Sequence, residues 1–360
     1  MKTLNRLFTY AALILPFTLL PQVSAHAEEK TDFKVAWSLY VGWLPLGYAN
    51  DTGIVKKWAD RYGINIEMVQ FNDYIESITQ YTSGDIDSVV LTNMDALSIP
   101  AAGGVDTTAF LLGDYSNGND AIILKNTDNL ADIKGQEVSL VEYSVSHYLL
   151  ARALHSVGLS ERDVSLTNTS DSDMIAAFET PGVNALVSWN PTVSTVLQNP
   201  AAKVAFDSSQ LPGEIIDIGI VKTDVLQDNP NFAKAMTGIW YESAALLKAN
   251  TPEGETAREA MAEMAGTDVA GLQQQLAATH LFDQPAEALE FIQAPALKDT
   301  MSHVSDFLLE KGLIDMQASS SGAIGIQMPD GAVIGNADNV TLRFTDTYIR
   351  NANAGELSNH

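Results

Sequence analysis

The stretch that decides the fold is Phe33–Leu39, FKVAWSL, a short and almost wholly apolar run with the length of a buried strand. The turn sequence VGWLP follows it at 41–45. A second strand is predicted at Ile64–Phe71, then a helix at Ile75–Thr82 and a third strand at Ser88–Leu91. Strands that alternate with helices are typical of βαβ units and a parallel sheet. The sequence therefore predicts an α/β fold.

The alternation pauses and then starts again further along the chain. A strand pair is predicted at Ala109–Gly113 and Asp120–Leu124, and a polar stretch follows at 126–135. Strands and helices then alternate as far as Val204–Phe206, and the apolar strand Ile215–Val221 can return to the first sheet. One lobe is thus expected to be inserted in the other.

Two crossings of the chain between lobes make a hinge, and closure of such a hinge around a ligand is a common motion. We predict that each lobe is a mostly parallel sheet flanked by helices. Lobe 1 is expected to comprise residues 28–122 and 216–360, and lobe 2 residues 123–215. The region from 231 to 312 is mostly helical in pattern and is expected to pack on lobe 1, followed by a last strand at Val340–Phe344.

The first residues have the layout of a cleavable secretory signal. Lys2 and Arg6 precede an apolar run, which the small-residue triplet at 25–27 ends. Residues 1–27 are therefore predicted to be a signal peptide, with the rest of the chain in the periplasm. The chain has no cysteine, which excludes disulfides, thiolate metal sites and a lipid-modified cysteine.

The charge balance is strongly acidic, with 45 acidic residues, 20 basic residues and a net charge of −25. Such a chain repels polyphosphates, so nucleic acid is excluded as a partner. A solvated acidic surface also serves solubility, as in a saline habitat. Net charge alone therefore does not identify the ligand.

Several segments resemble a known family. The run 129–138, NLADIKGQEV, and the helix start at 146–150 resemble type II periplasmic binding proteins of the nitrate/taurine/thiamine-precursor class. Within that class, the segments 37–43, 92–97, 100–106 and 113–120 resemble the periplasmic components associated with urea (guanidine) carboxylase. The resemblance implies a monomeric receptor without a cofactor. It would bind a small solute such as guanidine or urea and deliver it to the permease of an ABC transporter in the inner membrane.

The expected binding site lies where loops meet at the carboxyl ends of strands. Its aromatic side chains would stack on a planar cation or urea-like solute, and its carboxylates and amides would accept N–H groups. The candidate substrate-binding residues are Trp37, Tyr40, Trp43, Asn93, Asp95, Asp114, Asn117, Asp120, Glu142, Ser144, Ser146, Trp189 and Asp217.

Some of these residues also have a structural interpretation. Trp37 follows an apolar strand and fits a core position as well as a cleft wall. Asp95 fits a helix cap before Ala96, and Ser144 and Ser146 fit caps of the next helix. Asp217 fits a structural acid between the lobes.

Other functions are less compatible with the residues. Some relatives on this fold make the thiamine pyrimidine with a Cys-rich motif, which this chain lacks, and its histidines do not have the spacing of a zinc motif. The acidic run at 171–173 lacks the glycine and terminal glutamate of a calcium loop, so no metal site is predicted. A receptor for a sulfonate, nitrate or a pyrimidine stays open as an alternative, although the candidate loops contain no basic residue.

Overall fold

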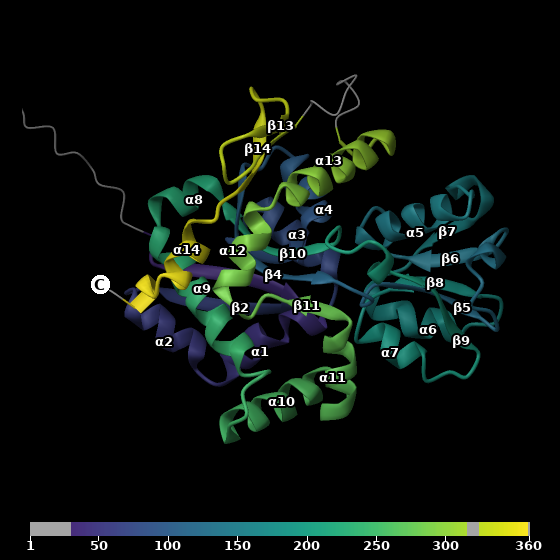
Figure 1. Cartoon of the computed structure of the whole chain (residues 1–360), viewed down its shortest axis with the longest axis horizontal. Helices are drawn as coiled ribbons and strands as arrows, with labels where there is room; N and C mark the ends of the chain where they lie inside the picture. Colours follow the sequence, from purple (N-terminus) through teal and green to yellow (C-terminus); the bar gives the residue numbers. More distant parts are fainter. Residues whose placement is uncertain (1–29, 315–323, 359–360) are drawn as a thin grey trace, which may run out of the picture.

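The computed structural model describes residues 30–314 and 324–358, so the predicted signal peptide lies outside the described residues. The chain forms an α/β structure with one nine-stranded and one five-stranded sheet (Figure 1). Lobe 1 holds the nine-stranded sheet, and lobe 2 holds the five-stranded sheet. The predicted α/β class and the two-lobed arrangement are confirmed.

The large sheet has the order β13-β12-β14-β4-β10-β3-β1-β2, and β11 pairs with β4. Its strands are β1 (Asp32–Ser38), β2 (Asn65–Phe71), β3 (Ser88–Thr92), β4 (Thr107–Ser116), β10 (Ile216–Lys222), β11 (Thr279–Leu281), β12 (Gly325–Gln327), β13 (Val333–Gly335) and β14 (Val340–Phe344). The small sheet has the order β7-β6-β8-β5-β9. Its strands are β5 (Ala121–Lys125), β6 (Glu137–Leu140), β7 (Ser165–Asn168), β8 (Ala185–Ser188) and β9 (Ala202–Asp207).

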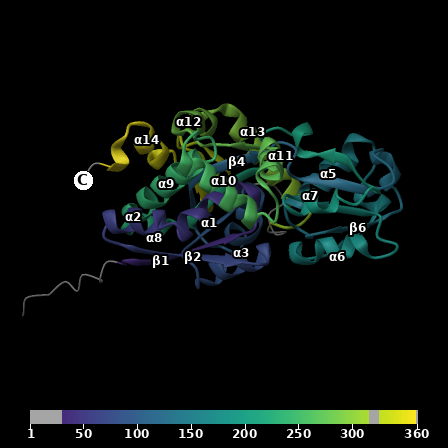
Figure 2. The ribbon, with the colours of Figure 1, turned by 90° about the horizontal axis from the view of Figure 1, so that it is seen from below.

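The helices cover both sheets, and Figures 1 and 2 show α5, α6 and α7 around the small sheet and the others around the large one. Those of lobe 2 are α5 (Val145–Ser156), α6 (Met174–Glu179) and α7 (Thr192–Val196). Those of lobe 1 are α1 (Leu44–Asp51), α2 (Ile54–Arg61), α3 (Tyr74–Ser83), α4 (Asn93–Ala96), α8 (Thr223–Asp228), α9 (Pro230–Ala245), α10 (Pro252–Met264), α11 (Val269–Ala277), α12 (Pro285–Gln293), α13 (Pro295–Glu310) and α14 (Thr347–Asn353). Short 3-10 turns include η1 (Val41–Trp43) and η4 (Glu161–Asp163).

The expectation of mostly parallel sheets is corrected. In the large sheet β10 runs antiparallel to both β3 and β4, and in the small sheet β5 runs antiparallel to β8 and β9. The strands β10 and β5 are the first ones after each crossing, because the chain leaves the large sheet after β4 and returns to it after β9. A strand that arrives from the other lobe runs against its neighbours, so both sheets are mixed.

The predicted pair of Ala109–Gly113 with Asp120–Leu124 is also wrong. These strands are β4 and β5, which belong to different sheets and do not pair. A short gap between two strands normally favours a hairpin, but here the segment between them carries the chain from one lobe to the other.

Large aromatic side chains fill the core of lobe 1 under helix α9. The rings of Phe33 on β1 and Phe232 on α9 stack at 4.7 Å, and Phe110 on β4 contacts Phe232 at 5.8 Å. Packing of this kind holds the large sheet rigid, so that the loops at its edge keep their positions. Within the described ranges, no helix has the length and apolar character needed to cross a membrane.

Candidate functional site

A small cavity lies between the two lobes, at the edge of the large sheet where β1 and β3 end and β10 begins. Its volume is about 20 Å³, slightly more than the roughly 10–15 Å³ that one water needs. Residues of both lobes line it, namely Ser38, Tyr40, Trp43, Tyr74, Thr92, Asp120, Val145, Trp189 and Asp217. The position agrees with the rule that ligands of α/β sheets lie beyond the carboxyl ends of strands.

Asp114 lies on β4, next to the cavity-lining Tyr40, and is completely buried. Its Oδ1 accepts a hydrogen bond of 2.7 Å from the Tyr40 hydroxyl, whereas its Oδ2 has no hydrogen-bond partner. Gly42 allows this arrangement, because a Cβ there would lie 2.2 Å from Asp114 Oδ2. Burial, together with the charge of Asp120, raises the pKa of Asp114 to about 7.

Asp217 and Asp120 bring two further carboxyl groups to the same place. Asp217, on β10, lies directly opposite Asp114 on β4 and lines the cavity together with Trp43. Burial raises the pKa of Asp217 well above its ordinary value, and Asp114 and Asp120 raise it further. Burial also raises the pKa of Asp120 to about 7. Carboxyl groups so placed favour a cation as their partner.

Asp95 links the two lobes. Its Oδ2 accepts hydrogen bonds from the hydroxyls of Tyr74 at 2.7 Å and Thr92 at 2.9 Å, and from the backbone N–H of Val145 in lobe 2 at 3.4 Å. The cap of α4 is Thr92, not Asp95, so the capping interpretation of Asp95 is wrong. Burial raises the pKa of Asp95 to about 6, and its Oδ1 has no hydrogen-bond partner.

Aromatic rings form the remaining walls of the cavity. Trp189 of lobe 2 meets Tyr74 of lobe 1 edge to face at 5.5 Å, and Trp43 is held against Trp240 at 5.3 Å. Trp37 does not line the cavity. Its ring packs on α1, where a Cβ at Gly47 would lie 2.6 Å from it. Trp37 therefore occupies the core position that its apolar strand also allowed.

Two candidate residues have their hydrogen-bonding groups engaged elsewhere. Asn93 donates to the Glu214 carbonyl at 3.1 Å and accepts from the Ile216 N–H at 3.1 Å, and so fixes the start of β10. The hydroxyl of Ser144 caps α5 by accepting from the Ser146 N–H. Both side chains serve the local fold.

Three further candidates do not belong to the cavity lining. Glu142 and Asn117 are half-buried outside it. The Ser146 hydroxyl is buried and has no hydrogen-bond partner.

Four lining residues were missed from the sequence: Ser38, Tyr74, Thr92 and Val145. Thr92 directly precedes the candidate Asn93 at the end of a strand. This position could have indicated Thr92 as a lining residue from the sequence. Tyr74 starts a helix and has the spacing of an ordinary helix residue. Val145 donates a backbone N–H to Asp95, and a side-chain pattern cannot indicate that.

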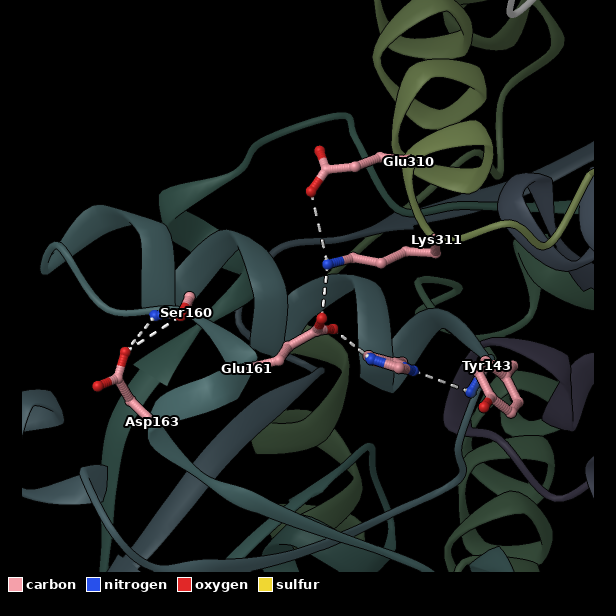
Figure 3. A network of polar contacts seen from close by, with 7 residues as sticks. Tyr143, Ser160, Glu161, Asp163, Glu310 and Lys311 are labelled. Atoms are coloured by element: carbon pink, nitrogen blue, oxygen red, sulfur yellow. Dashed lines mark hydrogen bonds and ion pairs between the residues drawn. The ribbon is translucent and has the colours of Figure 1, made fainter. Parts of the chain in front are cut away.

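A second network joins the lobes away from the cavity (Figure 3). Lys311, just beyond α13, pairs with Glu161 on η4 at 2.6 Å, and Glu161 also contacts His147 Nε2 at 2.5 Å. The His147 contact and the Lys311 contact hold the pKa of Glu161 down at about 2, although partial burial opposes this. The ring of Phe307 on α13 meets Tyr148 on α5 edge to face at 5.0 Å.

The groove beside this network is larger, about 790 Å³, and lies between α5 and α13. Two of its basic groups already have acidic partners, since Lys311 pairs with Glu161 and Arg152 pairs with Glu214. The small cavity instead has buried carboxylate oxygens without a donor. The small cavity is therefore the candidate ligand site.

Comparison with known proteins places the chain in a family. A curated relative, the taurine-binding periplasmic protein of Escherichia coli (strain K12), is 24% identical over 182 residues, which are 49% of this chain and 56% of the relative. The aligned part thus spans little more than half of that relative's length.

Solved structures show the same fold at lower identity. The alkanesulfonate-binding protein from Xanthomonas axonopodis pv. citri bound to MOPS superposes with a TM-score of 0.67 at 19% identity, covering 81% of this chain and 97% of that one. The periplasmic nitrate-binding protein from Synechocystis PCC 6803 gives a TM-score of 0.57 at 13% identity, covering 92% of this chain and 98% of the other. The model of the NMT1-like family matches residues 26–266, two thirds of the sequence, and the chain belongs to this family.

Proposed function

We propose that this chain is the periplasmic solute-binding receptor of an ABC importer. It captures a small nitrogen-rich solute, guanidine, urea or a related compound, between lobe 1, which holds the nine-stranded sheet, and lobe 2, which holds the five-stranded sheet. It then delivers the solute to the permease and catalyses no reaction itself. The family, the fold and the names of the taurine-, alkanesulfonate- and nitrate-binding proteins support the receptor role.

The observation that carries the choice of solute is the acidic cavity. Asp120 and Asp217 line it, Asp114 and Asp95 lie beside it, and none of its described lining residues is a lysine, arginine or histidine. A buried carboxylate without a countercharge is costly, and a bound cation removes that cost. Guanidinium presents N–H groups in a plane, so that it can form paired, charge-assisted hydrogen bonds to carboxylates.

The aromatic walls favour the same class of solute. Tyr40, Trp43 and Trp189 are aromatic residues that line the cavity. A planar cation on such a face gains cation–π attraction of up to about 2 kcal/mol when it is desolvated. The small volume favours a solute of only a few heavy atoms, because a larger one requires the lobes to separate.

Sulfonate is the second candidate, and the names of the relatives favour it. The taurine-binding relative and the alkanesulfonate-binding structure are both similar to this chain. A sulfonate group needs N–H or O–H donors, however, and the carboxylates of this cavity would repel it. A pyrimidine precursor of thiamine is a further alternative, because it would also stack on the aromatic walls.

Calorimetric titration of the mature protein at about pH 7.5 tests the proposal. The panel is guanidinium chloride, urea, taurine and a hydroxymethylpyrimidine. We expect guanidinium to bind most tightly and Asp120→Asn to weaken it at least about tenfold, which is 1.4 kcal/mol.

The exposed Asp60 on α2 supplies the matched control, since Asp60→Asn removes the same charge outside the cavity. The affinity of the Asp60→Asn protein for guanidinium should equal that of the unmodified protein. Binding of taurine without binding of guanidinium would overturn the proposed solute class.

A further inference from the structure

We propose that Asp114 and Asp217 form a carboxyl pair that holds one proton in the ligand-free protein, and that capture of a cation displaces this proton. The pair is a property of the protein itself. The displacement step rests on the proposed function, because it requires a cationic solute.

The register of the large sheet brings the two side chains together. Asp217 on β10 lies opposite Asp114 on the antiparallel strand β4. Opposed residues of this kind have Cβ atoms about 4.5–5.5 Å apart. Both residues are buried, since Asp114 is 0% and Asp217 only 6% exposed. Water therefore does little to screen the repulsion between two negative charges there.

The hydrogen bonds around the pair leave one carboxylate oxygen without a donor. Asp114 Oδ1 accepts a hydrogen bond from the Tyr40 hydroxyl. Asp114 Oδ2 has no donor, and the backbone at Gly42 closes over it. An ionised carboxylate offers only acceptors, so two of them facing each other cannot bond. A proton on either one makes an O–H···O⁻ hydrogen bond and removes one of the charges.

The groups that face the pair from neighbouring elements also favour the protonated form. Asp120 before β5 and Asp95 on α4 add negative charge, and burial together with these carboxylates keeps Tyr40 and Tyr74 neutral by raising each pKa. Among the described residues that line the cavity there is no basic side chain. The raised pKa values of Asp114 and Asp217 are consistent with this arrangement.

A bound cation reverses the preference of the pair for the protonated form. Its positive charge stabilises the doubly ionised pair, so the O–H bond of the protonated carboxyl breaks and the proton passes to a buffer base. The vacated oxygen then accepts an N–H group of the solute. The exchange conserves charge in the site, since one cation enters as one proton leaves. Neutral urea cannot drive it.

The ligand-free protein tests the pair directly. With aspartate labelled by ¹³C at the carboxyl carbon, NMR from about pH 4 to about pH 9 should show two coupled titration steps for Asp114 and Asp217, the second above neutrality. Asp217→Asn should leave Asp114 with a single step at lower pH, because the amide then donates to it. Asp114→Asn should do the same for Asp217.

A buried aspartate outside the cavity is the control. Asp283 is 3% exposed and pairs with Lys248 at 2.7 Å, so Asp283→Asn should leave both steps unchanged. Independent titration of Asp114 and Asp217, each complete below about pH 5, would overturn the pair.

Calorimetry in two buffers of different ionisation enthalpy then tests the displacement. Guanidinium binding near pH 7 should release up to about one proton, and Asp217→Asn should abolish most of the release. Guanidinium binding without proton release would overturn the displacement while leaving the proposed function intact. Failure of guanidinium to bind would overturn the solute class and the displacement, but the NMR result on the pair would stand.

Discussion

At the scale of single residues, the site is built from groups that weaken the fold. Asp95, Asp114, Asp120 and Asp217 are all buried, and burial raises the pKa of each. A carboxyl whose pKa is raised on folding stabilises the folded state when protonated, and that contribution is lost as the pH rises through the folded pKa. These residues therefore lower the free energy of unfolding at neutral pH. A bound cation raises it again.

Replacing one of these carboxyl groups should make the empty protein more stable at alkaline pH. For Asp120, the stability of the folded protein falls as the pH rises from about 4, the ordinary pKa of the carboxyl, to about 7, its pKa in the folded protein. We expect Asp120→Asn to raise the free energy of unfolding at pH 8 on the order of 2 kcal/mol or more, and much less at pH 4. Urea denaturation at the two pH values measures this difference.

The exposed variant Asp60→Asn should show no such pH dependence, because its carboxyl is 61% exposed. An Asp120→Asn protein that is less stable than the unmodified one at pH 8 would contradict the assignment of Asp120 as an uncompensated buried acid.

At the scale of elements, the contact of α13 with lobe 2 holds the closed arrangement from outside the cavity. Phe307 packs on Tyr148 of α5, and Lys311 pairs with Glu161 of η4 (Figure 3). The two residues of this ion pair are only 20% and 25% exposed. Partial burial makes the pair stronger than a surface salt bridge, and separating the lobes must break it.

Loss of this ion pair should weaken solute binding without touching the cavity. The Lys311 ammonium lies over the Phe307 ring, and Lys311→Met removes this charge while it keeps an unbranched side chain. We expect affinity to fall by about threefold to tenfold, because the closed state becomes less populated, and the dissociation rate to rise. Stopped-flow measurement of tryptophan fluorescence checks both quantities.

Lys56 on α2 offers a comparable but exposed pair with Asp60. Lys56→Met should bind solute like the unmodified protein. If Lys311→Met also binds with unchanged affinity, α13 has no part in closure.

At the scale of the whole molecule, the described arrangement is closed. Hydrogen bonds cross between the lobes from Val41 N–H to the Asn190 carbonyl at 3.3 Å and from Tyr74 N–H to Asp171 at 3.2 Å. The cavity is too small for exchange of a solute with the surroundings. Capture and release therefore require the lobes to separate about the two connections between the sheets.

Saturating guanidinium should shift the protein to this closed arrangement. Small-angle X-ray scattering should show a smaller radius of gyration with solute than without it. At a fixed guanidinium concentration, chosen as 100 times the Kd measured at pH 8, the free energy of unfolding at pH 8 should rise by about 2.7 kcal/mol. The gain should be larger at pH 8 than at pH 5.5, because protonated carboxyls compete with the cation. An equal gain at both pH values would contradict the acidic site.

Local patterns in the sequence determined the class of the fold and much of the chemistry of the site. The apolar run at 33–39 became β1, the strands at 64–71 and 88–91 became β2 and β3, and the candidates Tyr40, Trp43, Asp120, Trp189 and Asp217 meet in one cavity. They were predictable because strand ends, turns and chain order are local properties, and parallel strands bring their ends together.

Only the tertiary structure decided which lobe each strand joins and which polar groups lack partners. The separation of β4 from β5, the core position of Trp37 and the pairing of Asn93 with β10 depend on contacts between segments far apart in the chain. The opposition of Asp114 and Asp217 depends on sheet register, because the two residues are 103 positions apart (217 − 114) and no local pattern brings them together. Burial and register are properties of the assembled chain, and they turn these acidic side chains into a candidate site for a cation.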